Sequence, residues 1–524
     1  MGLHVTGRLL PNEATAQQWA SAYAEVLTLV DAYDFLDIVS DRERFAKYGA
    51  VWHYGVKTRE RECNNKTGLF ICGALSGCVT AESQALFRQF EHYSEGIGSP
   101  QGEVCRDALC TILKNRRCFA ELDRYHDASK TIFGNKTQGF AHHNYLLAIC
   151  LLLEDRLGHA FVTDGDITRG QIKAAIAWAN QHLQRPVSLP DRMNNEALLS
   201  RLRSFIPPDI LLSAFLQLSF NPKDEEMGAF LRANFTVADI FAYWQREADN
   251  TKPGTFGAQE FFLDYFAMSD DLSLLTKVCL HNYTPEQYAK QLANSRIFEE
   301  TKETKDPLKL TAASSNRETP ESISVVMGKV FGMGMRNSAV ARYISIEKGI
   351  ADIAPILPGA NELIAKAMEE CKPRNASVEE TIKKLDEASE SLAEGIQSVD
   401  VYEPEALVFY ERGFRLRDNM WLTLKKIREF VDEHKTKVRA DFDTHFGKHD
   451  IRDTISARMA VLVHCGRHLL PKTAWDYFES RIADDGFFDA ILGLHSLQSD
   501  TVPLCYYVKG ILCNRELFED VMLS

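Results

Sequence analysis

Residues 146–185 read LLAICLLLEDRLGHAFVTDGDITRGQIKAAIAWANQHLQR, and this stretch decides the fold class. An apolar run is followed by Thr168-x-x-Gln171, the capping-box pattern whose side chains satisfy free backbone amides at a helix start. The pattern predicts a helix that begins near Arg169. Five apolar residues at helical spacing would form its buried face: Ile172, Ala175, Ile176, Ala179 and Leu183.

Helical spacing of apolar residues dominates the rest of the chain as well, whereas strand-like alternation is short and rare. Residues 12–38 read as one or two helices, and residues 142–218 and 234–292 read as two further helical blocks. Residues 41–100 are mixed and rich in turn residues, with room for a short hairpin. We therefore predict an all-α fold class.

The composition argues against a membrane-spanning protein, a secreted protein and a protein with a wholly basic surface. With 524 residues and 45% hydrophobic content, the chain can bury more than one core, which suggests roughly two to four domains. The longest apolar run, Tyr145 to Leu153, is far shorter than the ~20 residues of a membrane span, and the first residues lack a secretory signal. Twelve cysteines without CxxC pairs indicate reduced thiols. A net charge of −13 argues against a wholly basic surface but is compatible with a basic groove in an acidic shell.

The helix predicted from Arg169 carries cations opposite its apolar face. Arg169 and Lys173 share that side with the amides of Asn180 and Gln184, and the helix start beside them adds backbone amides that can face an anion. Four further arginines follow closely: Arg185, Arg192, Arg201 and Arg203. This region could hold several phosphates. The alternative interpretation is an ordinary amphipathic helix with a solvated polar side.

A second helix is predicted within residues 319–336, which read TPESISVVMGKVFGMGMR. Thr319 suits the N-cap and Pro320 the first turn, while Gly332 and Gly334 should end the helix. Four residues on or just after it suit a nucleic acid: Lys329, Arg336, Arg342 and Tyr343. Cations that meet phosphates beside an aromatic ring on which a base can stack favour sequence-independent binding of a single strand. Helix packing through small residues is the alternative.

These two stretches, in this order, resemble the nucleoproteins of non-segmented negative-strand RNA viruses, the order that includes paramyxoviruses, pneumoviruses, filoviruses and rhabdoviruses. That family has a helix reading roughly P-x-x-x-S-x-x-[LM]-G, and Pro320, Ser324, Met327 and Gly328 are in register with it. Residues 146–185 are similar to the family's apolar helix, acidic turn and following helix.

The chain departs from the family pattern at three positions. Thr319 stands where the family has an aromatic residue before the proline, and Ala177 and Trp178 stand where pneumoviruses have paired arginines. The resemblance covers about residues 145–360.

The resemblance implies a two-lobed helical fold that holds single-stranded RNA in a cleft between the lobes, with terminal arms that join protomers. It implies an N-terminal arm or helix (1–40), an N-terminal lobe (41–255), a C-terminal lobe (256–400) and a C-terminal helical extension or arm (401–524). The RNA-binding residues would be Arg169, Lys173, Arg185 and Arg192 on one side of the cleft and Lys329, Arg336, Arg342 and Tyr343 on the other.

The implied function is that of a viral nucleoprotein, which encapsidates genomic RNA independently of sequence and polymerises into the nucleocapsid that the polymerase copies. Its partners would be single-stranded RNA, further copies of itself in a filament or ring, and a viral phosphoprotein and polymerase. Its location would be the virion and the host cytoplasm, with the host nucleus left open. We expect no enzyme activity, cofactor or metal. The alternative is a helical scaffold or adaptor, such as an effector, that binds other proteins.

Two further patterns bear on function. Asp164-Gly-Asp166 resembles the metal-binding DxD of glycosyltransferases, but that site follows a strand of a parallel sheet, and the preceding residues read as a helix. Residues 424–439, LKKIREFVDEHKTKVR, are either a further RNA-facing surface or an ordinary solvated helix.

Overall fold

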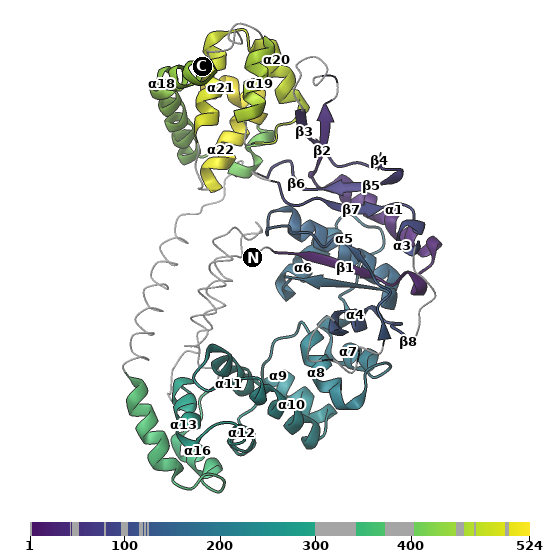
Figure 1. Ribbon diagram of the computed structural model, residues 1–524, viewed down its shortest axis with the longest axis vertical. Helices are drawn as coiled ribbons and strands as arrows, with labels where there is room; N and C mark the ends of the chain where they lie inside the picture. The colour runs from purple at the N-terminus through teal and green to yellow at the C-terminus, as the bar shows by residue number, and fades with distance from the viewer. Residues whose placement is uncertain are drawn as a thin grey trace.

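The computed structural model describes residues 3–41, 43, 52–77, 80–95, 103–114, 119, 122, 125–298, 342–372, 403–446, 455–465, 468–497 and 502–523. Helices dominate this described chain, and small β-sheets occur within its first 165 residues (Figure 1). The prediction of a helix-rich chain is confirmed, but an all-α class leaves out these sheets. None of the described helices is long and apolar enough to cross a membrane.

The sheets are mostly antiparallel. In the sheet nearest the candidate site, β1 (Val5–Leu9) lies between β10 (Lys130–Ile132) and β11 (Phe161–Gly165). In a second sheet, β2 (Phe35–Asp41) lies between β3 (Trp52–Lys57) and β6 (Gly73–Ala74). In a third sheet, β5 (Lys66–Ile71) lies between β4 (Arg61–Cys63) and β7 (Gln84–Phe87). A fourth sheet consists of β8 (Glu103–Val104) and β9 (Tyr125–His126), which are parallel.

A short hairpin within residues 41–100 is confirmed. Strands β4 and β5 are joined directly at Asn64 and Asn65, whose positive φ angles of 51° and 61° suit a tight two-residue turn. Asparagine tolerates this left-handed conformation better than most residues, so the turn is encoded locally.

Three hydrophobic cores organise the described chain. The first core is enclosed by the β1 sheet, α1 (Ala16–Ala32), α5 (His142–Leu157) and α6 (Arg169–Ala179). The second core contains α4 (Ala108–Lys114), α7 (Asn195–Leu202), α8 (Pro208–Leu218), α9 (Glu225–Asn234), α10 (Val237–Asp249), α11 (Phe256–Met268), α12 (Leu272–Cys279), α13 (Pro285–Asn294), α16 (Ile346–Ile353) and the helical residues 360–372.

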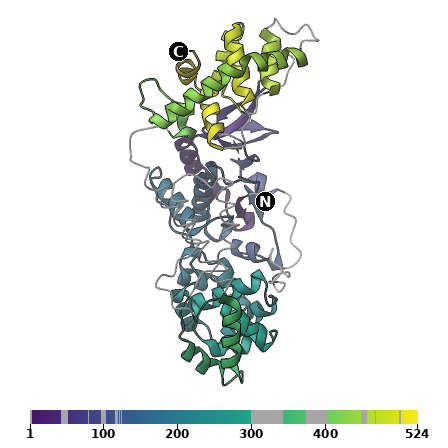
Figure 2. The ribbon, with the colours of Figure 1, turned by 90° about the vertical axis from the view of Figure 1, so that its left-hand side faces the viewer.

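The third core lies in the C-terminal part of the chain. It contains η5 (Pro404–Phe409), α18 (Asp418–Phe446), α19 (Ile455–Cys465), α20 (Lys472–Arg481), α21 (Asp485–Ser496), α22 (Val502–Cys513), α23 (Arg515–Phe518) and η6 (Glu519–Leu523). Short elements elsewhere are η1 (Pro11–Glu13), α3 (Glu91–Ser94), η3 (Gly158–Ala160) and η4 (Asp191–Met193). In both ribbon views the elements of the first core lie between those of the other two, so the C-terminal helices lie next to the N-terminal strands although the two are far apart in the sequence (Figures 1 and 2).

Residues 1–40, for which the resemblance implies an arm or helix, contribute to the first core. β1 is hydrogen-bonded on both sides, and Trp19 and Val26 of α1 are fully buried. The helix expected up to residue 38 ends at Ala32, and residues 35–41 form β2 instead. These residues form a strand because β2 pairs with β3 and β6, partners that no local pattern reveals.

The helix predicted from residue 169 is confirmed. α6 begins at Arg169. The Thr168 hydroxyl accepts a hydrogen bond from the backbone N–H of Gln171, and the Gln171 side-chain oxygen accepts one from the backbone N–H of Thr168, which completes the capping box. All five residues of the predicted apolar face are buried: Ile172, Ala175, Ile176, Ala179 and Leu183. This face packs α6 against α5 and fixes which side of the helix meets solvent.

The third core is attached to the first through β3. The Gly55 amide donates a hydrogen bond of 3.0 Å to the Leu470 carbonyl, and a Cβ at Gly55 would lie 2.6 Å from the end of the Leu36 side chain, which would have to move to admit a larger residue. Tyr54 packs against the third core, and Lys509 of α22 donates to the Gly77 carbonyl. The C-terminal helices are thereby held beside the N-terminal sheet.

Two buried histidines predict a loss of stability in acid. Burial, with a smaller effect from a neighbouring histidine, lowers the pKa of His142 to about 3 and that of His495 to about 4. In the unfolded chain both imidazoles take up a proton near pH 6.5. Between pH 6.5 and 4 the unfolded state therefore binds more protons, so the free energy of unfolding falls as the pH falls, by on the order of 4 kcal/mol at pH 5.

Urea unfolding at pH 7 and pH 5 measures this effect. We expect the His142→Gln/His495→Gln variant to lose most of the difference between the two pH values. His182→Gln, at an exposed imidazole, is the control and should keep it. An unchanged difference in the double variant would show that other groups cause the acid sensitivity.

Candidate nucleic-acid interface

The two predicted cations on α6 lie outside the first core. Lys173 is exposed and Arg169 is half-buried. Neither forms an ion pair or hydrogen bond with any residue that the structure describes, and the buried Nε of Arg169 is left without an acceptor. A buried guanidinium N–H without a partner is costly to the fold.

Arg185 is exposed but already paired. Its guanidinium lies 3.2 Å from Glu25 of α1, and the same carboxylate accepts from Arg156 at 2.8 Å. The hydrogen bond from Arg156, together with Arg185, lowers the pKa of Glu25 despite its partial burial. A phosphate at Arg185 would compete with this carboxylate, which makes Arg185 a weaker candidate than the cations of α6.

Arg192 is a wrong prediction. Its side chain in η4 is only 4% exposed, and its guanidinium lies 3.9 Å from the centre of the Phe220 ring. Its Nε donates to the Leu218 carbonyl at 2.7 Å and its Nη1 to the Thr163 carbonyl at 2.8 Å. These bonds join β11 to the end of α8, so Arg192 links the first and second cores and cannot reach an RNA backbone.

The second group of predicted residues is described only in part. Lys329 and Arg336, with the predicted helix within 319–336, lie outside the described residues. Arg342 lies 3.8 Å from Glu225 of α9 and 3.9 Å from Asp270, and Tyr343 beside it is 46% exposed. This pair adjoins the second core, whereas α6 belongs to the first.

Four aromatic side chains from three segments meet beside α6, and the sequence analysis missed them as a group. The aromatic cluster consists of Tyr33 at the end of α1, Tyr145 of α5, Trp178 of α6 and His182 just after it. The Tyr33 and Tyr145 rings stack at 3.6 Å between centroids, and Trp178 meets the Tyr145 ring edge-to-face at 4.8 Å. Only the Trp178 and His182 spacing could have been found from a helical pattern.

Compared with protein-family models, curated proteins and solved structures, this chain shows no match. Its function therefore has to be argued from the geometry of its own residues.

The Asp164-Gly-Asp166 pattern begins inside a strand, since Asp164 and Gly165 are the last residues of β11, so the prediction that the residues directly before it are helical was wrong. That strand, β11, runs antiparallel to β1, unlike the parallel strand that precedes a nucleotide-sugar site. Asp166 accepts from the His4 amide at 2.9 Å, and Asp164 lies 3.9 Å from Arg192. Both carboxylates thus serve the fold. Across the described ranges, no group of three or more His, Cys, Asp or Glu side chains could hold a metal.

The basic stretch at 424–439 forms part of α18, and most of its cations face carboxylates. Lys425, Arg428 and Lys435 pair within the helix with Glu429 or Asp432, and Arg439 pairs with Asp489 of α21 at 2.7 Å. This arrangement is typical of a solvated helix.

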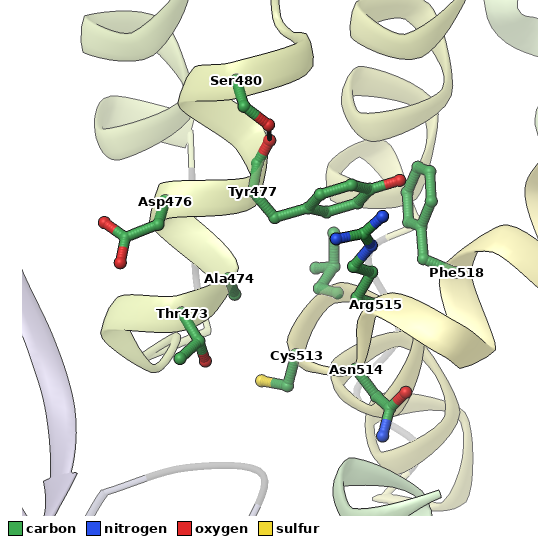
Figure 3. A pocket seen from close by; sticks show the side chains of 10 residues that line it. Thr473, Ala474, Asp476, Tyr477, Ser480, Cys513, Asn514, Arg515 and Phe518 are labelled. Atoms are coloured by element: carbon green, nitrogen blue, oxygen red, sulfur yellow. Dashed lines mark hydrogen bonds between the residues drawn. The ribbon is translucent and has the colours of Figure 1, made fainter. Parts of the chain in front are cut away.

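A separate pocket of about 400 Å³ lies between α20 and the α22–α23 segment (Figure 3). Its polar side chains are mostly committed: Asn514 caps α23, Ser480 donates to the Tyr477 carbonyl, and Arg515 pairs with Glu519 at 2.8 Å while lying over the Tyr477 ring. The pocket therefore presents few free groups to a ligand.

Proposed function

We propose that this chain is a nucleoprotein that binds single-stranded RNA through its phosphates, without reading sequence, and polymerises on it into a nucleocapsid. The observation that carries the proposal is the pair Arg169 and Lys173. Both lie on the solvent side of α6, and neither is neutralised by a carboxylate among the described residues. Phosphate contacts suit genome packaging because every nucleotide carries the same charge.

Arg342 and Tyr343 would form a second contact surface, together with Lys329 and Arg336. The carboxylates near Arg342 are themselves well exposed, with Glu225 at 79% and Asp270 at 54% of their side chains. Such exposed pairs at almost 4 Å contribute little stability, so a phosphate can displace them. A base could stack on the exposed ring of Tyr343. The protein would hold the strand in the cleft between its two lobes.

A few cations per protomer are enough if the protein polymerises. Each neutralised phosphate on a single strand contributes about 0.7 to the salt dependence, and lateral contacts between protomers make successive binding events cooperative. The chain as a whole has a net charge of −13, so the surface away from these cations is acidic and disfavours RNA. A viral phosphoprotein and polymerase, and a location in the virion and host cytoplasm, belong to the same proposal.

Nucleic acid in the purified protein tests the proposal. Recombinant protein at low salt should carry host RNA and show a high absorbance ratio at 260 over 280 nm, which falls after nuclease and high salt. Negative-stain images should then show rings or filaments before treatment. Protein that is free of RNA and binds no added oligonucleotide would favour the alternative, a helical scaffold that binds other proteins.

A further inference from the structure

One ring of the aromatic cluster beside α6, that of Trp178, packs against the first core and is also partly exposed to solvent. Tyr33 and Tyr145 are half-buried and stack on each other, so they are held rigidly by the first core. Trp178 stands edge-on to Tyr145 and is itself half-buried, and His182 next to it is exposed. A rigid, partly exposed indole is a surface on which a flat ring can stack with little loss of side-chain entropy.

Trp178 also has an unused hydrogen-bond donor. Its indole N–H donates to no described residue, and it is not among the buried polar atoms that lack a partner, so it faces solvent. The fully buried Trp19 is different, because its indole N–H donates to the Phe87 and Arg88 carbonyls. Trp178 thus combines a partly exposed ring with a donor that no described residue uses.

The indole lies on the same helix as the unpaired cations. Lys173 and Trp178 are five residues apart, which is about 7.5 Å along the axis and about 140° around it, so they flank one solvent-facing strip of α6. Only small exposed side chains, Ala174 and Ala177, stand between them. A single strand crossing this strip could place a phosphate at Lys173 and a base at Trp178.

We infer that Trp178, supported by Tyr145 and Tyr33, is a nucleobase-stacking site that fixes one base per protomer beside the cations of α6. The inference rests on the proposed RNA-binding function and adds a contact to the base. A free indole N–H and an ammonium group on opposite borders of one exposed strip fit a single strand better than an apolar protein segment, because the strand supplies π-faces, acceptors and negative charges in succession.

An abasic competitor separates base stacking from phosphate binding. Full-length protein, stripped of RNA by nuclease and high salt, is titrated with a labelled oligoadenylate and with an abasic phosphodiester of equal length. Trp178→Ala should weaken oligoadenylate binding about tenfold or more and leave abasic binding within about twofold. Trp178→Phe should restore part of the loss. Trp421→Ala, at an exposed tryptophan of α18, is the control and should change neither affinity.

Tryptophan fluorescence provides a second measurement, which compares the wild type with Trp178→Phe and so keeps an aromatic ring at position 178. Oligoadenylate should quench wild-type emission more than that of Trp178→Phe, whereas the abasic strand should quench both alike. Equal weakening of both strands in Trp178→Ala, or no difference in quenching, would overturn the stacking site while leaving RNA binding intact. Failure of the wild-type protein to bind either strand would instead overturn the proposed function and this inference with it.

Discussion

Arg169→Glu combined with Lys173→Glu is expected to abolish RNA retention and to lower the affinity for a single strand by at least about 100-fold. Two charge-assisted hydrogen bonds to phosphate are lost, each contributing roughly 1.5–3 kcal/mol, and repulsion replaces them. If residual binding can be measured, its salt dependence should fall by about 1.4 because two phosphate contacts are missing. Absorbance ratios after purification and fluorescence titrations over a salt series measure both effects.

Folding should survive this change. Both side chains lie outside the first core, and a glutamate in the first turn of α6 interacts favourably with the helix dipole, so circular dichroism should match the wild type. The matched control is Lys426→Glu/Lys437→Glu, which makes the same change in net charge at exposed positions of α18. Retention of RNA by the α6 variant would exclude α6 as the interface. Equal losses in both variants would point to net charge instead of a site.

Arg192→Met is expected to destabilise the protein by roughly 3–5 kcal/mol without a direct effect on RNA contacts. The substitution leaves the Leu218 and Thr163 carbonyls without their donor inside the protein. It also removes a positive charge near Glu154. Burial raises the pKa of the Glu154 carboxyl, and Arg192 is one of the groups that oppose this rise. Urea unfolding followed by circular dichroism measures the loss.

Arg185→Met is the appropriate comparison, since both arginines were predicted RNA contacts. Arg185 is 64% exposed and pairs with one partly exposed carboxylate, so its removal should cost at most about 1 kcal/mol. If the two variants lost equal stability, the bonds of Arg192 would contribute far less than their burial implies.

The helices were largely predictable because their signals are local. The capping box at Thr168 and Gln171 and the apolar spacing after it all lie within residues 168–183, and α6 forms there. The strands were not predictable in this way. β11 follows directly after helical residues, and it is a strand because β1, more than 150 residues earlier, provides its hydrogen bonds.

In the candidate site, too, some features follow from local sequence and others from contacts between distant segments. Sequence alone determined that α6 exists, where it begins and that Arg169 and Lys173 lie opposite its apolar face, since helical periodicity fixes these relations. Only the tertiary structure decided which cations are free. Arg185 faces Glu25 and Arg192 is enclosed by β11 and α8, because packing brought distant acceptors to them. It likewise assembled Tyr33, Tyr145 and Trp178 from three segments, since side-chain contacts between elements depend on how the elements pack and not on their spacing in the chain.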